Sequence, residues 1–231
     1  MNTIEAIVFD FDGTLYDSSG VMELSFRLEH DFLQKHEGMT AEQAHNFLIS
    51  NGILTEARSA TECFLRNGIN PEDWAEYRTK YFDVSCVDAA TAVQTEIIEE
   101  FRKFGKLLLL SSNTLEVMQI IMQRIGMSSE IFDEVICSNH HRLTGKFSKA
   151  EAFREIINEY KNILSIGDRY HSDIEPAVRL GGAGILVNAP SSVLHILDDI
   201  SKGIIKTDST EYTYYPPGQL PLLPESACPR P

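Results

Sequence analysis

One short segment near the start of the chain, residues 4–17, constrains the fold and the chemistry more than any other stretch. It reads IEAIVFDFDGTLYD, an apolar run that ends in Asp10, Asp12 and Gly13. The run is long enough for one buried strand, and residues two apart on a strand point the same way. A glycine suits the sharp turn that must follow the strand. The segment therefore predicts two carboxylates held side by side at the end of a buried strand.

Two neighbouring carboxylates repel each other, so this arrangement needs a cation or a shared proton to compensate the repulsion. Magnesium prefers oxygen ligands and is usually held by one or two carboxylates. A carboxylate can also serve as a nucleophile when a second group handles the protons. Asp10 and Asp12 are therefore candidates for a magnesium site in which a carboxylate nucleophile lies beside an acid/base carboxylate.

The residues that follow, 17–87, show helical periodicity with no strand between the helices. Apolar side chains fall on one helical face in four successive stretches, and Pro71 suits the start of the fourth helix. We expect a small helical bundle inserted after the first strand. The four faces consist of Val21, Leu24, Leu28 and Phe32; Ala41, Ala44, Phe47 and Leu48; Ala57, Ala60 and Phe64; and Trp74, Tyr77 and Tyr81.

Strands and helices alternate from residue 106 onward, after a further helical face at 93–104. This alternation predicts an α/β fold, a doubly wound parallel sheet with helices on both faces. The core would comprise residues 1–16 and 88–205, with the helical insert at 17–87. The predicted strands are 107–110, 134–137, 163–166 and 185–187, the last of the sheet, and the predicted helices are 115–125, 149–160 and 174–180.

The final segment, 206–231, has a different composition. From Glu211 onward it holds six prolines in 21 residues, together with Tyr212, Tyr214 and Tyr215. Proline removes a backbone donor and favours extended conformations, so this composition predicts an extended, non-helical C-terminal arm.

Composition narrows the classes of function. A net charge of −14 argues against nucleic acid as a partner, because phosphate backbones need basic patches. The four cysteines are scattered with no CxxC pair, which indicates neither a zinc site nor a disulfide framework. The sequence shows no signal peptide and no apolar run of a membrane span's length. We therefore expect a cytoplasmic protein; its oligomeric state stays open, with a homodimer among the alternatives.

Polar side chains gather where the predicted strands end, which is where open parallel sheets bind ligands. The first strand ends in Asp10 and Asp12, the second in residues 111–113, and the strand ILSIG in Asp168, with Asp173 shortly after. A lysine-containing loop precedes the helix at 149. Phosphoryl transfer requires such a set: an anionic nucleophile, a cation, and donors for the phosphate oxygens.

DxDGT after an apolar strand closely resembles the first motif of the haloacid dehalogenase-like (HAD) hydrolases, and all four motifs of that family occur in order. By position, the resemblance implies that Asp10 is a nucleophile forming an aspartyl-phosphate. Asp12 would protonate the leaving group and then activate water. Magnesium (Mg²⁺) would be held by Asp10, the backbone carbonyl of Asp12, and Asp168, while Asp173 would act through a water or orient Asp168.

The second motif would bind the substrate phosphate. Ser111 directly follows the apolar strand and is our choice for the phosphate-binding hydroxyl, with Ser112 and Asn113 in the donor loop. The same residues also suit the cap of the next helix, and the two roles do not compete.

The site lysine is either Lys149 or Lys146. Ser148 and Glu151 form a capping-box pattern, which makes Lys149 the first helical residue. A lysine there opposes the helix dipole, so another partner must favour it, and a phosphate with nearby carboxylates would do so. We therefore choose Lys149, although the segment departs from the common KPxP form of the motif.

The resemblance implies a magnesium-dependent phosphatase acting on a small phosphorylated metabolite. Residues 1–16 and 88–205 would form its catalytic core, and the helical insert at 17–87 would be a cap that selects the substrate. A dehalogenase would not need the acid at Asp12. A sugar phosphomutase shares the motifs and stays an alternative. A phospho-accepting signalling or binding module is another, although such receiver domains are shorter and lack the helical insert. Tyr16, after DGTL, slightly favours the nucleotidase and phosphoglycolate phosphatase branches.

Overall fold

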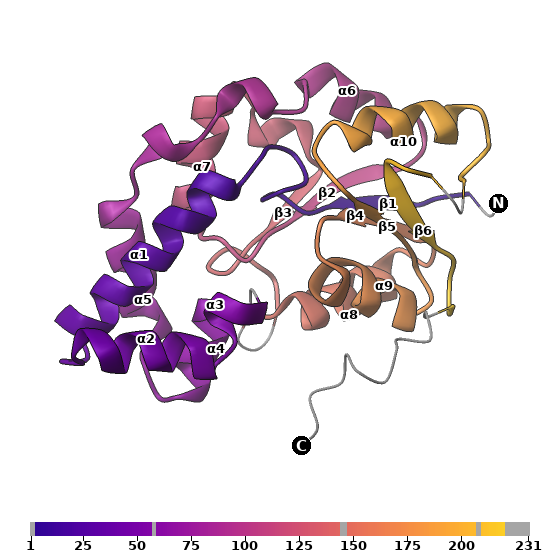
Figure 1. Ribbon diagram of the computed structural model, residues 1–231. Coiled ribbons are helices and arrows are strands. Elements are labelled where there is room, and N and C mark those ends of the chain that lie inside the picture. Colours follow the sequence, from indigo (N-terminus) through magenta and orange to yellow (C-terminus); the bar gives the residue numbers. More distant parts are fainter. Residues whose placement is uncertain (1–2, 57–58, 144–146, 207–208, 220–231) are drawn as a thin grey trace.

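The computed structural model describes residues 3–56, 59–143, 147–206 and 209–219. A sheet with helices on both faces lies beside a separate group of helices, the cap (Figure 1). No helix in these described ranges combines the length and the apolarity needed to cross a membrane.

The sheet carries the strands in the order β3-β2-β1-β4-β5-β6 within the described residues. The first five are parallel, and β6 runs antiparallel to β5. Strand β1 lies between β2 and β4, so the carboxyl ends of these three strands meet at one edge. The strands are β1 (Ala6–Phe9), β2 (Lys106–Leu110), β3 (Glu134–Ile136), β4 (Ile163–Gly167), β5 (Ala183–Val187) and β6 (Tyr212–Tyr215).

Both faces of the sheet are covered, which is why its central strands consist mainly of apolar residues. Alternate residues of β1 serve the two faces: Ile7 joins one apolar cluster and Val8 the other. One face packs against α6 (Thr95–Glu100), α7 (Leu115–Ile125) and α10 (Ser192–Ser201), and the other against α8 (Lys149–Glu159) and α9 (Glu175–Arg179). Short turns complete the core: η1 (Val84–Cys86), η2 (Ala89–Thr91), η3 (Phe101–Lys103), η4 (Ser129–Ile131) and η5 (Tyr170–Ile174).

The cap has an apolar core of its own, in which Phe32, Phe64 and Trp74 contact one another. The second and the last of its helices begin with conventional N-terminal signals. The Thr40 hydroxyl accepts from the Gln43 N–H, and Pro71 occupies the first turn of the last helix. The cap helices are α1 (Ser19–Lys35), α2 (Ala41–Ser50), α3 (Ile53–Glu56), α4 (Ala60–Arg66) and α5 (Pro71–Tyr81).

The predicted α/β class and the doubly wound parallel arrangement are confirmed. Helix α7 has its predicted bounds: Thr114 accepts from the Val117 N–H at its start, and Gly126 ends it with φ of 71°. The predicted helix at 174–180 instead begins earlier, as the π-helical turn η5, which continues into α9. Such wide turns are frequent at functional sites, and this one carries Asp173.

Two elements differ from the sequence-based expectation. The strand at 185–187 is not the last one, because β6 in the C-terminal arm pairs with β5. Tyr212 explains the pairing: its ring is buried, and its hydroxyl donates to Asp199 Oδ2 at 2.7 Å. Tyr212–Tyr215 are good strand formers, but the prolines that follow them favoured an irregular arm over a strand in the sequence-based prediction. Helix α10 was also not predicted. Residues 220–231 of the arm lie outside the described residues.

Candidate active site

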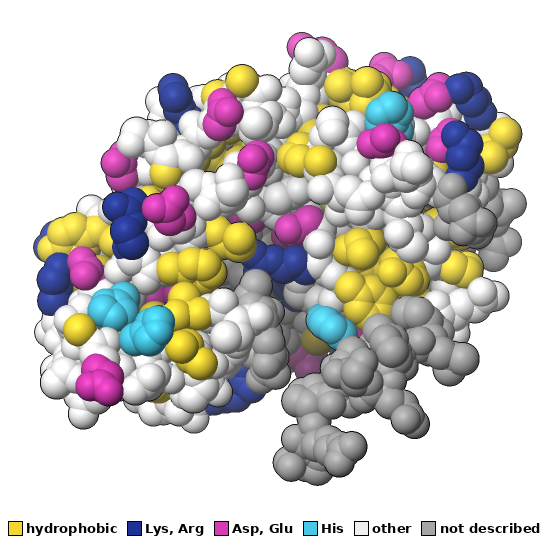
Figure 2. All heavy atoms as spheres, in the orientation of Figure 1, with side chains coloured by type: hydrophobic (Ala, Val, Ile, Leu, Met, Phe, Trp, Pro, Cys, Tyr) yellow, Lys and Arg dark blue, Asp and Glu magenta, His cyan; other side chains and the backbone are white. Residues whose placement is uncertain are grey.

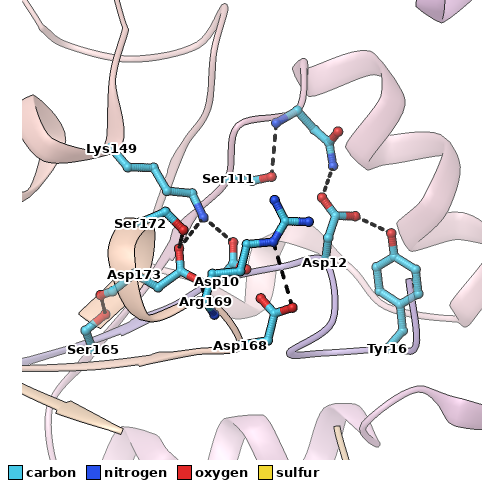
Figure 3. A network of polar contacts seen from close by, with 11 residues as sticks. Asp10, Asp12, Tyr16, Ser111, Lys149, Ser165, Asp168, Arg169, Ser172 and Asp173 are labelled. Atoms are coloured by element: carbon cyan, nitrogen blue, oxygen red, sulfur yellow. Dashed lines mark hydrogen bonds and ion pairs between the residues drawn. The ribbon is translucent and has the colours of Figure 1, made fainter. Parts of the chain in front are cut away.

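Three neighbouring strands deliver the candidate residues to one edge of the sheet. Asp10 follows β1, Ser111 follows β2, and Asp168 follows β4. Asp173 reaches the same place from η5, and Lys149 reaches it from the first turn of α8. Figure 3 shows these side chains converging on a common centre. The fold therefore brings together acids that are far apart in the sequence.

The centre of the site is an acidic cluster bound by one ammonium group. One carboxylate oxygen each from Asp10, Asp168 and Asp173 lies within 4.8 Å of the others. Lys149 Nζ lies 2.5 Å from Asp10 Oδ1 and 2.7 Å from Asp173 Oδ1. All of these side chains are buried except that of Asp168, which is about one quarter exposed (26%). The ammonium therefore bridges two of the three acids.

Electrostatics in this cluster favour a bound cation. Burial raises the pKa of Asp10 well above its ordinary range, and the neighbouring charge of Asp173 raises it further, against the lowering effect of Lys149. Burial alone would lower the pKa of Lys149, but the two carboxylates in contact with it reverse the sign and raise that pKa. One lysine thus does not fully compensate the acids.

Asp173 is held rigidly by its surroundings. Its Oδ2 accepts from the Arg169 N–H at 2.9 Å, and its Oδ1 accepts from the Ser172 hydroxyl at 2.8 Å. The backbone of β4 approaches closely as well, because a Cβ on Gly167 would lie only 2.4 Å from the Asp173 Cβ. These contacts make Asp173 a fixed acceptor for Lys149.

Asp12 occupies a different environment from Asp10, although the two are separated by one residue. The Tyr16 hydroxyl donates to Asp12 Oδ1, and Asn113 Nδ2 donates to Asp12 Oδ2 at 2.5 Å. The Asn113 N–H in turn donates to Ser111 Oγ at 3.1 Å. Two neutral donors thus fix the Asp12 carboxylate, whereas Asp10 is bound by a charged one.

A cavity of about 110 Å³ lies over this edge, between the cap and the sheet. Asp12, Ser112 and Asn113 line it from the sheet side, and cap residues line the opposite side. In Figure 2 the surface is hollowed between the two parts, and basic side chains lie inside the hollow. A small molecule bound there would meet Asp12 and the end of β2 together.

A comparison with family models matched residues 7–175 to the haloacid dehalogenase-like hydrolases. The matched region includes β1, the cap and every candidate site residue. The chain belongs to this family. The predicted resemblance and the predicted hydrolase class of enzyme are confirmed. A comparison with curated proteins found no significant match.

Solved structures of HAD-like hydrolases share the fold. A HAD phosphatase from Thermococcus onnurineus is 19% identical, with a TM-score of 0.52 over 80% of this chain and 86% of that one. A HAD-hydrolase from Bacillus subtilis, described as bound to magnesium, is 14% identical, with a TM-score of 0.51 over 85% of this chain and 100% of that one. At these identities the likeness establishes the fold.

Three observations show that the residues of this HAD-like site fit a divalent cation. Asp168 Oδ1 is buried without a hydrogen-bond partner among the described residues. Gly13, with φ of 78°, leaves the space beside this carboxylate open, since a Cβ there would lie 2.3 Å from Asp168 Oδ2. Counted over the described residues alone, the formal charges at this edge leave an excess of two negative charges. The acids are Asp10, Asp12, Asp168 and Asp173, and the basic side chains are Lys149 and Arg169.

Each predicted site residue except Lys146, which lies outside the described residues, can be located. The acids and Lys149 meet at the centre, and Ser111, Ser112 and Asn113 line the adjoining turn. Sequence reasoning gave no role to Arg169, whose Nε lies 4.0 Å from Asp168 Oδ2, or to the hydrogen bond of Tyr16. Because Arg169 directly follows Asp168 in the sequence, its closeness to the site could have been predicted.

Proposed function

We propose that this HAD-like hydrolase is a magnesium-dependent phosphatase that hydrolyses a small phosphorylated metabolite through an aspartyl-phosphate. The observation that carries the proposal is the contrast between the two aspartates of β1. Asp10 lies in an acidic cluster against an ammonium, while Asp12 is held by two neutral donors beside the cavity. A nucleophile and an acid/base need such separate environments.

In the first step, a carboxylate oxygen of Asp10 attacks the phosphorus and the bond to the leaving-group oxygen breaks. Asp12 gives its proton to that oxygen, which leaves as an alcohol. Tyr16 and Asn113 hold Asp12 in position, and Lys149 orients Asp10 while balancing its charge. The phosphoryl group would lie near Ser111 and Ser112 at the end of β2.

In the second step, a water attacks the phosphorus of the aspartyl-phosphate and gives a proton to Asp12. The bond between phosphorus and the Asp10 oxygen breaks, which releases phosphate, restores the Asp10 carboxylate and leaves Asp12 protonated for the next cycle. Asp10, Asp168 and the Asp12 carbonyl would hold magnesium, which supplies electrostatic stabilisation of the phosphate oxygens. A cap over the cavity would limit the entry of other water.

The experiment is an assay of a generic phosphomonoester with Mg²⁺, with and without a chelator. We expect phosphate release that stops in the chelator and returns when Mg²⁺ is added in excess. As a control, calcium should replace magnesium poorly, because it prefers longer bonds and more ligands. Full turnover in the chelator would contradict the metal assignment, and no turnover of any phosphomonoester would contradict the phosphatase itself.

A further inference from the structure

The cap contains two ionisable side chains, each with a buried polar atom, that the chemistry described above does not use. Glu29 on α1 is only 5% exposed, and its Oε2 has no hydrogen-bond partner among the described residues. Arg78 on α5 has a buried Nε that is likewise unpartnered there, although its Nη2 donates to Ser25 Oγ at 3.3 Å. Both side chains line the cavity that also contains Asp12.

A buried polar atom without a hydrogen-bond partner is unfavourable, so its presence in both side chains needs an explanation. Burial raises the pKa of Glu29 to about 8, and the charge of Arg78 only partly opposes this shift. The neighbouring positions Leu24, Leu28 and Phe32 on α1 join the apolar core of the cap. An apolar side chain at position 29 would therefore be compatible with the fold, and the carboxyl group must serve another purpose.

The position of Asp12 identifies which part of a substrate would face Glu29 and Arg78. As the group that gives a proton to the leaving-group oxygen, Asp12 must lie on the leaving-group side of the phosphate. A second, larger cavity of about 880 Å³ touches Gly13, Asp168 and Arg169, but it does not include Asp12. The leaving group thus belongs in the smaller cavity, with Glu29 and Arg78 beside it.

We propose that Glu29 and Arg78 recognise the leaving group of the phosphomonoester by binding adjacent hydroxyls, which selects small polyol or sugar monophosphates. This inference rests on the proposed phosphatase function. A guanidinium only donates hydrogen bonds, whereas a hydroxyl both donates and accepts, so a pair of hydroxyls satisfies Arg78 and Glu29 together.

Other leaving groups fit these two residues less well. A carboxylate would accept hydrogen bonds from Arg78, but it has no proton with which to donate a hydrogen bond to the unpartnered oxygen of Glu29. A bare alkyl chain would leave both polar groups unpaired, and a site built to bind a hydroxyl discriminates strongly against an analogue without it. The cavity, at about 110 Å³, is also well below the usual range of roughly 300–1,000 Å³ for drug-sized ligands, which disfavours a nucleoside.

The test uses a matched pair of esters, glycerol 3-phosphate and n-propyl phosphate, which differ only by two adjacent hydroxyls. For the full chain with Mg²⁺, we expect kcat/KM to be higher for the glycerol ester by at least about tenfold, the scale of one hydrogen bond to a charged group. Glu29→Met, close to Glu in shape, should bring this ratio near one and should not lower Tm. Arg78→Met should also reduce the ratio.

Glu23→Gln is the matched control, because Glu23 is an exposed residue of the same helix, and its ratio should equal that of the wild type. A ratio near one in the wild type, or a ratio that survives Glu29→Met, overturns the proposal. A higher kcat/KM for phosphoglycolate than for the glycerol ester overturns it in favour of carboxylate recognition. In all of these cases, hydrolysis of the esters would still support the proposed phosphatase function, because only the selectivity would be contradicted.

Calorimetric binding to Asp10→Asn with Mg²⁺ separates recognition from catalysis. We expect the glycerol ester to bind at least about tenfold more tightly than the propyl ester, and Glu29→Met in the same background to remove the difference. If Asp10→Asn binds the glycerol ester more tightly but the wild type hydrolyses neither ester, the recognition of hydroxyls stands and the phosphatase function is contradicted. Equal binding of the two esters overturns the recognition.

Discussion

The sheet edge and the cap both bury charged side chains, but the two regions satisfy them differently. At the sheet edge, Lys149 contacts Asp10 and Asp173, and further donors hold Asp173 in place. In the cap, Glu29 and Arg78 each have a buried polar atom without a partner among the described residues. At the sheet edge the protein's own donors hold Asp10, Asp12 and Asp173, and Asp168 Oδ1, unpartnered among the described residues, belongs to the candidate cation site. In the cap, the unpartnered atoms belong to two residues that line the cavity.

The difference separates chemistry from recognition. Catalytic groups gain from being fixed before the substrate arrives, because no reorganisation is then needed in the transition state. Groups that select a substrate must make their contacts with the substrate itself, so part of their hydrogen-bonding capacity stays unused without it. We therefore expect substitutions at the sheet edge to affect every ester, and substitutions at Glu29 to affect selectivity.

Replacing the nucleophile gives the largest expected effect. Asp10→Asn removes the attacking carboxylate while keeping the size of the side chain, so kcat should fall on the order of 10⁴-fold or more. The measurement is phosphate release under saturating substrate and Mg²⁺. Asp198→Asn, at an exposed position of α10, is the control and should retain activity. A wild-type rate in Asp10→Asn would rule out the covalent mechanism.

Asp12→Asn should reduce kcat by roughly 10²–10⁴-fold, the usual contribution of a positioned acid/base. Its nucleophile is intact, so the loss should be smaller for esters whose leaving groups need no proton. A comparison of an aryl ester with an alkyl ester measures this dependence. If the loss is the same for both esters, Asp12 does not protonate the leaving group.

Lys149→Ala should reduce kcat at least about 100-fold, on the scale of one lost donor to the transferring group. The reason is that Lys149 Nζ contacts Asp10 directly. Lys146→Ala, at the alternative position, should have a mild effect, and Lys161→Ala at an exposed position should have none. A large loss in Lys146→Ala with little change in Lys149→Ala would reverse the assignment of the site lysine.

Glu29 should make the free energy of unfolding depend on pH. Its pKa is about 8 in the folded protein, against 4.5 for an unperturbed glutamate, so above pH 4.5 the unfolded chain releases a proton that the folded chain keeps. Stability should therefore fall as pH rises through this window, by up to about 1.4 kcal/mol per pH unit. Denaturation of Glu29→Met at pH 5 and pH 8 should show a smaller decrease than the wild type, and an equal decrease would contradict the burial of Glu29.

Tyr16→Phe gives the smallest expected effect. It removes one hydrogen bond to the Asp12 carboxylate, worth about 1.5 kcal/mol at the lower end for a charged acceptor, so kcat should fall roughly tenfold. The loss should follow the leaving-group dependence of Asp12→Asn, because Tyr16 acts through Asp12. Tyr81→Phe, at a residue 48% exposed in the cap, should leave the rate unchanged. If the loss of kcat in Tyr16→Phe does not depend on the leaving group, Tyr16 does not act through Asp12.

The same two regions differ in how much the sequence alone could predict. The position of Asp10 and Asp168 follows from local signals, since each directly ends an apolar strand and parallel strands bring such ends together. Lys149 could be chosen from its place at a helix start. Glu29 and Arg78 could not, because a polar residue in an amphipathic helix looks like a solvated position until the packing of α1 against α5 is known.

The cap and the arm illustrate the same limit. The cap helices α1, α2 and α5 follow from periodicity, but which of their polar residues face inward depends on tertiary packing. Strand β6 was missed because a short aromatic run among prolines reads as an extended arm, and only the edge of β5 provides its partner. The hydrophobic pattern of a single helix or strand can be interpreted from the sequence. The strand or helix that packs against it cannot, when the two are distant in the chain.

The central claim is that Asp10 becomes phosphorylated while the other residues of the sheet edge only support that step. Acid quenching of the wild type during turnover with Mg²⁺, followed by peptide mass mapping, tests it most directly. The account predicts a phosphoryl group on the peptide that contains Asp10, and more of it in Asp12→Asn, where the water is no longer activated. Steady phosphate release with no phosphorylated Asp10 in either protein would contradict the account.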